Sequence, residues 1–217
     1  MLVVGCPAES AVGPMAAASL DRRLRVVSPG HITGDALPGT VTVEDGLASP
    51  AIRLDGSGMV CGPTQQKCTQ LLLALSEAEL DSTLLNELSR TLSDWAARKG
   101  MARVVAFDGR AASEDDAQPE ANVHVATNLS GMEMVNTYGF QEVSGTLNGM
   151  GVALLRAALA RPFPVICLIP TVSISRSERD VTVHVINLLQ PMESALSRST
   201  IIEPSKLSPP PIRGSNC

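Results

Sequence analysis

The fold is decided by residues 68–107, which read CTQLLLALSEAELDSTLLNELSRTLSDWAARKGMARVVAF. The stretch begins with a near-continuous apolar run, as expected of a strand covered on both faces, although its leucine content would suit a helix equally well. A helix is predicted next, from a cap at Asp81 or Ser82 to Lys99. Residues 101–107 then form a second buried strand. This strand–helix–strand order predicts a parallel sheet whose crossover connection is right-handed.

Further strands and helices are predicted on both sides of this stretch. A first strand begins at Leu2, and a helix covers residues 15–24 with Ser10 as its N-cap. Downstream we expect a strand at 122–127, a helix at 129–138, a helix that opens at the glycine-rich turn 144–151 and runs to Arg161, a strand at 164–169 and a helix at 180–197. The last two strands, with the helices between them, predict a second strand–helix–strand passage of a parallel sheet.

Residues 1–197 are predicted to form a single α/β domain. Its irregular part is a hairpin-rich insertion near residues 29–62, where glycines and prolines separate short β-prone pieces at 40–44, 51–55 and 59–61. An acidic segment at 113–120 predicts a solvated loop. Residues 198–217 are rich in proline and predict a flexible C-terminal tail.

The composition is that of a folded, water-soluble protein. Of the 217 residues, 44% are hydrophobic, so the chain can bury a core without needing a disulfide or a metal, and its five cysteines are expected to be reduced. The net charge of -5 and the shortage of aromatic residues do not suit nucleic-acid binding. No apolar run approaches the roughly 20 residues of a membrane span, and the N-terminus opens on a strand rather than a signal peptide. We therefore expect a cytoplasmic protein with no nucleic-acid or membrane partner.

One stretch is suited to binding a small anion, the turn from Gly145 to Gly151 at the start of a predicted helix. The first N–H groups of a helix and the helix dipole attract negative charge. The glycine spacing matches neither a P-loop nor a dinucleotide-binding fingerprint, so close turn packing and helix capping are the alternative role. The candidate pocket residues are Gly145, Thr146, Asn148, Gly149 and Gly151.

Other sequence patterns typical of catalytic or metal-binding sites are missing. His31, His124 and His184 lie far apart and form no metal-binding pair. No Gly-x-Ser-x-Gly turn presents a nucleophile. We therefore expect no catalytic residue, no metal and no cofactor, although residues remote in sequence can still converge in the fold.

The chain resembles the proteasome assembly chaperone family, particularly its archaeal members, in segments that follow one another in the family's order. They are Leu2–Pro7 leading through Gly13 into a small-residue helix, the helix, glycine and buried strand at 84–105, the glycine-marked turn and helix at 144–155 with the strand at 164–170, and the closing helix at 180–196. The glycine-marked turn is the most specific of these segments. The likeness covers residues 2–197.

This resemblance implies a three-layer α/β/α domain with a mainly parallel central sheet, similar to the nucleoside phosphorylase and hydrolase folds but without a known catalytic centre. It implies a non-enzymatic, ATP-independent chaperone that binds proteasome α-subunits, and a homo-oligomer, as archaeal members look to be. Some members carry a C-terminal hydrophobic-Tyr-any tail that docks into the proteasome ring. This sequence ends in Gly214-Ser215-Asn216-Cys217 and has Tyr138 as its only tyrosine, so a surface patch near the sheet edge or the 29–62 insertion is expected to hold the client instead.

Two further functions stay open. The first is a phosphorylase-like or hydrolase-like enzyme on the same fold, with Asn148 and the glycine turn forming an anion pocket and His124 or Asp108 acting as the acid or base. The second is a small-ligand sensor or scaffold unrelated to proteasomes. A pocket with two or more convergent polar side chains would favour the enzyme, whereas an apolar, self-complementary patch would favour the chaperone.

Overall fold

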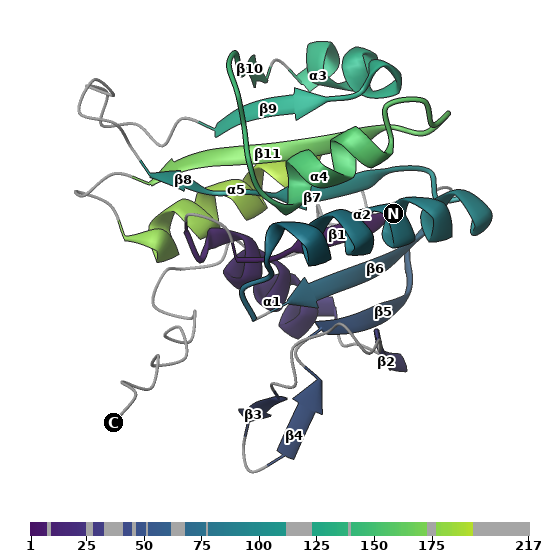
Figure 1. The fold of residues 1–217 in the computed structure, drawn as a ribbon, viewed down its shortest axis with the longest axis vertical. Coiled ribbons are helices and arrows are strands. Elements are labelled where there is room, and N and C mark those ends of the chain that lie inside the picture. Colours follow the sequence, from purple (N-terminus) through teal and green to yellow (C-terminus); the bar gives the residue numbers. More distant parts are fainter. Residues whose placement is uncertain are drawn as a thin grey trace.

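One mixed β-sheet, covered by helices on both faces, forms the body of the protein in the computed structural model (Figure 1). The structure describes residues 1–7, 10–24, 28–32, 41–44, 47–50, 52–61, 68–76, 78–111, 123–138, 140–172 and 177–192. The acidic segment 113–120 and the tail 198–217 lie outside these residues, so what the sequence predicts for them stays a prediction.

The central part of the sheet is parallel. The strands in chain order are β1 (Leu2–Gly5), β2 (Ser28–His31), β3 (Val41–Glu44), β4 (Leu47–Pro50), β5 (Ile52–Cys61), β6 (Cys68–Ser76), β7 (Val104–Phe107), β8 (Arg110–Ala111), β9 (Val123–Thr127), β10 (Gln141–Glu142) and β11 (Val165–Val172). Across the main sheet they follow the order β10-β9-β11-β7-β1-β6-β5-β2, and β8 pairs with β11. The neighbours β11, β7, β1 and β6 are parallel, whereas β9, β5 and β2 each run antiparallel to the strand on their inner side.

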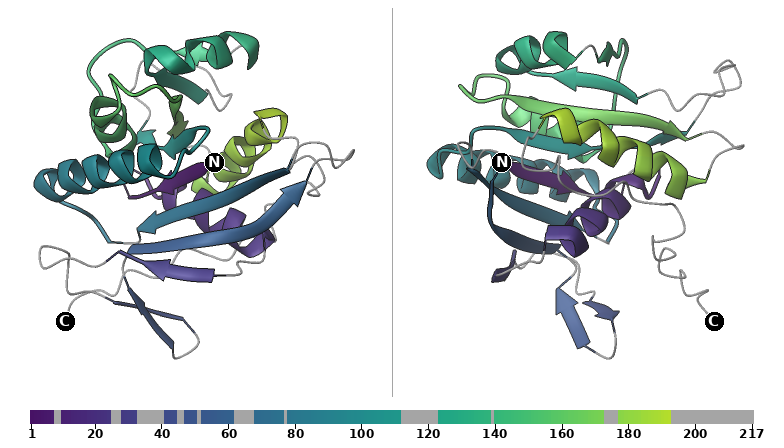
Figure 2. Two further views of the ribbon diagram at one scale, coloured as in Figure 1. Left: turned by 90° about the vertical axis from the view of Figure 1, so that its right-hand side faces the viewer. Right: turned by 180° about the vertical axis from the view of Figure 1, so that it is seen from behind.

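Helices form a layer on each face of this sheet. α1 (Val12–Leu24) and α5 (Glu178–Met192) contact each other on one face, and α2 (Ser82–Arg98) and α4 (Met150–Ala157) contact each other on the other. The turned views show the sheet between the two helix pairs (Figure 2). A short helical turn, η1 (Leu129–Gly131), and α3 (Met132–Tyr138) follow β9. The three-layer α/β/α fold with a mainly parallel central sheet is therefore confirmed. None of the described helices is long and apolar enough to cross a membrane.

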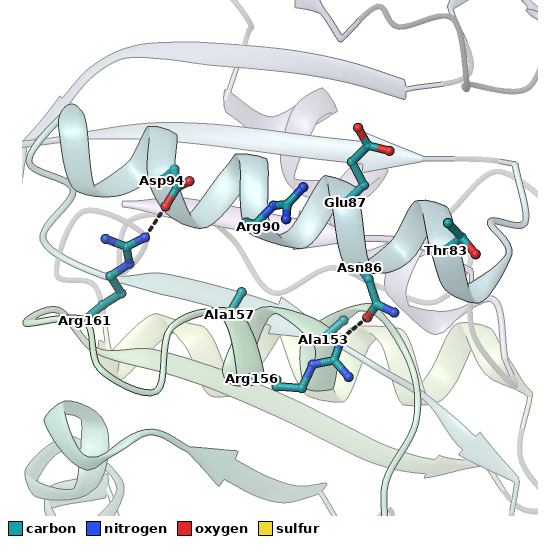
Figure 3. Close-up of a pocket in the computed structure, with 9 residues that line it drawn as sticks. All are labelled: Thr83, Asn86, Glu87, Arg90, Asp94, Ala153, Arg156, Ala157 and Arg161. Carbon is teal, nitrogen blue, oxygen red and sulfur yellow. Dashed lines mark hydrogen bonds and ion pairs between the residues drawn. The ribbon is translucent and has the colours of Figure 1, made fainter.

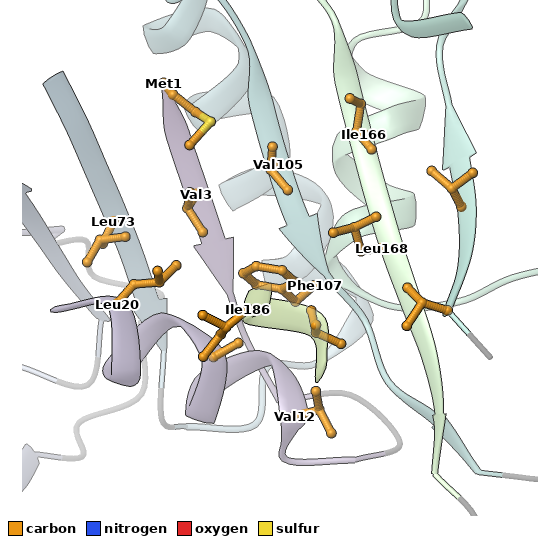
Figure 4. Close-up of a cluster of buried hydrophobic side chains, with 14 of the residues drawn as sticks. Met1, Val3, Val12, Leu20, Leu73, Val105, Phe107, Ile166, Leu168 and Ile186 are labelled. Atoms are coloured by element: carbon orange, nitrogen blue, oxygen red, sulfur yellow. The ribbon is translucent and has the colours of Figure 1, made fainter. Parts of the chain in front are cut away.

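Both faces of the central strands are buried, because successive side chains of a strand point to opposite faces. In β1, Val3 belongs to the apolar cluster beneath α1 and α5, whereas Leu2 and Val4 belong to the cluster beneath α2 and α4. Figure 4 shows the first cluster, where Phe107 of β7 is completely buried among the side chains of the strands and helices. A strand covered on both faces needs apolar residues at consecutive positions, which is why the apolar runs predicted these strands correctly.

The stretch that decides the fold adopts the predicted structure. Asp81 caps α2, and its carboxylate accepts hydrogen bonds from the N–H groups of Thr83 at 2.8 Å and Leu84 at 2.9 Å. Leu88 and Leu92 of α2 are buried against the sheet. β6 and β7 lie parallel on either side of β1, so the connection through α2 carries the chain across β1.

The second predicted strand–helix–strand passage is wrong in direction. β9 and β11 are neighbours but antiparallel, with Val125 opposite Leu168. β9 begins at the same edge of the sheet at which β7 ends. It therefore runs in the opposite direction to β7 and β11 (Figure 1). α3 then leads to β10, which pairs with β9 in parallel, and α4 leads into β11. Apolar periodicity locates such strands, but it carries no information about their direction.

The region near residues 29–62 contains both sheet strands and a hairpin. β2 and β5 extend the main sheet, and the pieces predicted at 51–55 and 59–61 are parts of the single strand β5. β3 and β4 pair with each other and project from the β2 side of the molecule (Figure 1). Elsewhere, the helix predicted to reach Arg161 ends at Ala157, where α4 stops.

A buried amide fixes the connection between α4 and β11. Asn128, which follows β9, is 2% exposed. Its Nδ2 donates hydrogen bonds to the carbonyl oxygens of Ala158 at 3.1 Å and Phe163 at 3.0 Å, and its Oδ1 accepts one from the N–H of Val165 at 3.0 Å. One side chain therefore satisfies three backbone groups at this end of the sheet.

Asn128→Ala is expected to lower the free energy of unfolding by about 2 to 4 kcal/mol, because three backbone groups lose their partner at a position that is 2% exposed. Urea unfolding monitored by circular dichroism measures this change. Ser130→Ala is the matched control: it removes an exposed hydrogen bond to the Arg161 carbonyl and should cost less than about 0.5 kcal/mol. Equal losses in the two variants would show that the amide does not hold the connection.

Candidate functional site

A cluster of polar side chains lies at the edge formed by the carboxyl ends of β1 and β7. The chain visits β6 on one side of β1 and then β7 on the other, and ligand sites of open α/β sheets lie at such switch points. Cys6 directly follows β1, and Asp108 directly follows β7. Because the carboxyl ends of parallel strands meet at one edge, the two side chains are neighbours.

The Asp108 carboxylate caps α4 from a neighbouring strand. Asp108 is 2% exposed, and its Oδ2 accepts hydrogen bonds from the N–H groups of Gly151 at 2.8 Å and Val152 at 3.2 Å. The thiol of Cys167 on β11 donates to the same oxygen at 3.5 Å. The two N–H groups belong to the first turn of α4, where the helix dipole favours a negative charge. The anion at this glycine-marked helix start is therefore the protein's own carboxylate.

Two glycines allow this contact. Gly149, the N-cap residue of α4, has a φ of 122°, and a Cβ at this position would lie 2.8 Å from the Asp108 Cγ. A Cβ at Gly151 would lie 2.3 Å from the Cys167 Sγ. Side-chain carbons do not approach other atoms so closely, so the turn, the carboxylate and the thiol fit together only with glycine at both positions.

The residues predicted as an anion pocket separate into two groups. Gly149 and Gly151 lie against the Asp108 carboxylate. Gly145, Thr146 and Asn148 are exposed to solvent. Helix capping and close turn packing, the alternative role for this turn, are what the geometry provides, and binding of an external anion by these residues stays a prediction.

Burial controls the protonation of the three side chains at this edge. It raises the pKa of Asp108 to about 6, and hydrogen bonds from Val152, Cys167 and Gly151 offset part of that rise. It raises the pKa of the Cys6 thiol to about 12, with a further contribution from the Asp108 charge. The pKa of Cys167 is raised well above its ordinary value for the same two reasons. Both thiols are free, stay protonated at neutral pH and are poor nucleophiles.

Asp108 and His124, the two residues considered as an acid or base, are not adjacent. His124 lies on β9, which is separated from β7 by β11 in the sheet. Its Nδ1 is buried and has no hydrogen-bond partner among the described residues, and the same holds for the Oδ1 of Asp108. The geometry therefore supports a structural role for the Asp108 carboxylate, in which Oδ2 makes the hydrogen bonds and Oδ1 makes none with a described residue.

Cys6 and Cys167 were missed by the sequence analysis as neighbours of Asp108. For Cys6 a signal existed, because Cys6 and Asp108 each come directly after a predicted buried strand of one parallel sheet. For Cys167 there was none. It lies within β11, and its side chain faces α4 only because of the register between β11 and β7.

The protein is a three-layer α/β/α domain with a cluster of Cys6, Asp108 and Cys167 at the switch-point edge of its sheet, named the edge cluster below. In this cluster the Asp108 carboxylate occupies the N-terminus of α4. The PAC2 family profile matches residues 2–204, and the chain belongs to this family. No curated protein shows significant sequence similarity to it. The resemblance carried by the sequence segments is thereby confirmed.

Solved structures share the fold at low sequence identity. Pyrococcus furiosus PbaA, described as an archaeal homolog of proteasome-assembly chaperone, superposes with a TM-score of 0.76 at 17% identity, covering 95% of this chain and 80% of that one. PbaB from the same organism, described as an archaeal proteasome activator, gives a TM-score of 0.72 at 15% identity, covering 95% and 86%. A PAC2 family protein from Streptomyces avermitilis gives 0.63 at 19% identity, covering 93% and 87%.

The protonation of Asp108 makes the stability of the fold depend on pH. Its pKa is raised in the folded state above the ordinary value of 3.8, so the folded protein binds this proton more tightly than the unfolded chain does. The contribution of this proton to stability is therefore fully present below the unfolded pKa of 3.8, declines above it and is lost as the pH rises through the folded pKa of about 6.

Asp108→Asn should remove this pH dependence, because the amide keeps an oxygen for the α4 N–H groups and carries no charge. Between about pH 8 and about pH 5, the wild-type chain is expected to gain on the order of 1 kcal/mol of unfolding free energy relative to the variant. Urea unfolding of both proteins at the two pH values gives the difference. If the difference in unfolding free energy between the wild-type chain and the variant is the same at both pH values, the pKa of Asp108 is not raised by burial and the prediction is wrong.

Proposed function

We propose that the chain is a non-enzymatic chaperone that binds proteasome α-subunits and assists their assembly without ATP. The observation that carries this proposal is the PAC2 family match over almost the whole chain, together with the fold shared with the two Pyrococcus furiosus proteins. Those proteins are described as a homolog of proteasome-assembly chaperone and as a proteasome activator. A proteasome-related role is what the two descriptions have in common.

The edge cluster supports the non-enzymatic part of the proposal. In α/β enzymes, helix starts at the carboxyl edge of the sheet offer their N–H groups to anionic parts of a substrate. Here two of these groups already hold the Asp108 carboxylate. A substrate anion would have to displace this carboxylate from a site that is 2% exposed, next to thiols that are protonated.

A chaperone of this kind holds its client by a surface. Val41 and Val43 on β3 are 61% and 63% exposed. Because they are two residues apart on a strand, they lie on the same face of the β3–β4 hairpin. We place the first contact with the client on this hairpin, and we expect the chain to act as a homo-oligomer in the cytoplasm.

One observation favours the enzyme as a second candidate, the Oδ1 of Asp108 that lacks a partner among the described residues. A buried carboxyl group with a raised pKa is typical of catalytic acids. A substrate would reach this oxygen only after the turn at Gly149 moved away from the carboxylate.

The test mixes the purified chain with proteasome α-subunits from the same organism, without nucleotide. Size-exclusion chromatography with light scattering should show a discrete complex, and its mass would give the stoichiometry. Val43→Asp should weaken the complex at least about tenfold, because it places a charge in an apolar contact. Leu129→Asp, at another exposed apolar side chain, is the matched control. Elution of the two wild-type proteins as separate species at tens of micromolar would overturn the proposal. The enzyme or the small-ligand sensor would then be favoured.

A further inference from the structure

A polar groove lies between α2 and α4 on the outside of their helix layer (Figure 3). Its volume is about 530 Å³. α2 contributes Asn86, Arg90 and Asp94, which are spaced four residues apart and therefore lie along one face of the helix. α4 contributes Ala153 and Ala157. The groove is open because these alanines are too small to fill the space opposite the long polar side chains of α2.

Three arginines line the groove, and within the described part of the chain only one of them has an acidic partner. Arg161 pairs with Asp94 at one end. Arg156 donates a hydrogen bond to the neutral amide of Asn86 toward the other end. Arg90 lies along α2 between these two contacts, is exposed, and makes no hydrogen bond or ion pair with a described residue (Figure 3).

The groove is therefore locally positive in a chain whose net charge is -5. Its other acid, Glu87, extends from the side of α2 that faces away from α4 (Figure 3). Arg90 and Arg156 thus have no carboxylate between them. A guanidinium presents its N–H groups in a planar fork that fits a carboxylate, so two such groups suit a ligand with two carboxylates.

The helix geometry sets the spacing of those carboxylates. Asn86, which holds Arg156, is one helical turn from Arg90, or about 6 Å along α2. In an extended peptide, alternate side chains point to the same side and are about 7 Å apart. A segment in which one residue of any type separates two acidic residues therefore matches the spacing of the two arginines.

We propose that the groove between α2 and α4 binds an extended acidic segment of a partner protein, with alternate carboxylates held by Arg156 and Arg90. Leu159, two residues before the lining residue Arg161, is 65% exposed, and we assign it the apolar contact beyond the second acid. This site goes beyond the function proposed above, because it does not require the partner to be a proteasome subunit.

Fluorescence anisotropy with a labelled peptide tests the site on the full chain. The probe is a hexapeptide with the sequence Glu-Ser-Glu-Ser-Leu-Leu, and the matched probe carries glutamine in place of both glutamates. At low salt the glutamate peptide should bind with a Kd of about 10 to 100 μM, and the glutamine peptide at least about tenfold more weakly. Added salt should weaken the binding of the glutamate peptide.

Arg90→Glu with Arg156→Glu should weaken binding of the glutamate peptide at least about tenfold. Arg98→Glu with Lys99→Glu, at the exposed C-terminal end of α2, changes the net charge equally and is the control. Arg90→Gln with Arg156→Gln is the milder second variant, and thermal melts establish that each variant is folded.

Three results would overturn the proposal: no binding up to about 1 mM, equal binding of the two peptides, or equal weakening by the two charge-reversed pairs. Displacement of the peptide by inorganic triphosphate at lower concentration would reassign the groove to a polyphosphate and overturn it as well. The experiment contains no proteasome subunit, so its outcome is independent of the mixing experiment.

Discussion

The carboxylate of Asp108 joins three parts of the fold at the carboxyl edge of the sheet. It follows β7, accepts hydrogen bonds from the first turn of α4 and receives the thiol of Cys167 on β11. α4 has only eight residues, too few for a helix to be stable by itself. Its position therefore depends on this cap and on its contacts with α2 and β11. The shape of the groove between α2 and α4 depends on the same cap, because the cap helps to hold α4 in place.

This cap places a negative charge where water does not reach, and the surroundings have to compensate for it. Two N–H groups, a thiol and the helix dipole favour the charge, and burial opposes it strongly enough to raise the pKa of Asp108 to about 6. The glycines at 149 and 151 are part of the same arrangement, because a side chain at either position would meet the carboxylate or the thiol. A side chain added at either glycine would therefore push the carboxylate or the thiol out of place.

How much could be predicted from the sequence depended on whether the signal was local. The central strands and α2 were predicted correctly because burial on both faces, a cap at Asp81 and apolar positions such as Leu88 and Leu92 all act within one segment. The direction of β9 relative to β11 could not be predicted, because apolar periodicity locates a strand without giving its direction. The glycine turn was visible as a helix start, but the carboxylate that occupies it lies 43 residues earlier in the chain. The groove could not be predicted, because the alanines of α4 that keep it open matter only where α4 lies beside α2.

The two outer strands of the described sheet are short. β10 has two residues, and β2 has four, one of them a proline, which has no N–H group to donate. A long edge strand exposes a row of unpaired backbone groups along which a second molecule can add its own strand. These short edges offer little backbone for such pairing. Among the described residues, the sheet edges are therefore poorly suited to growth into open-ended fibres.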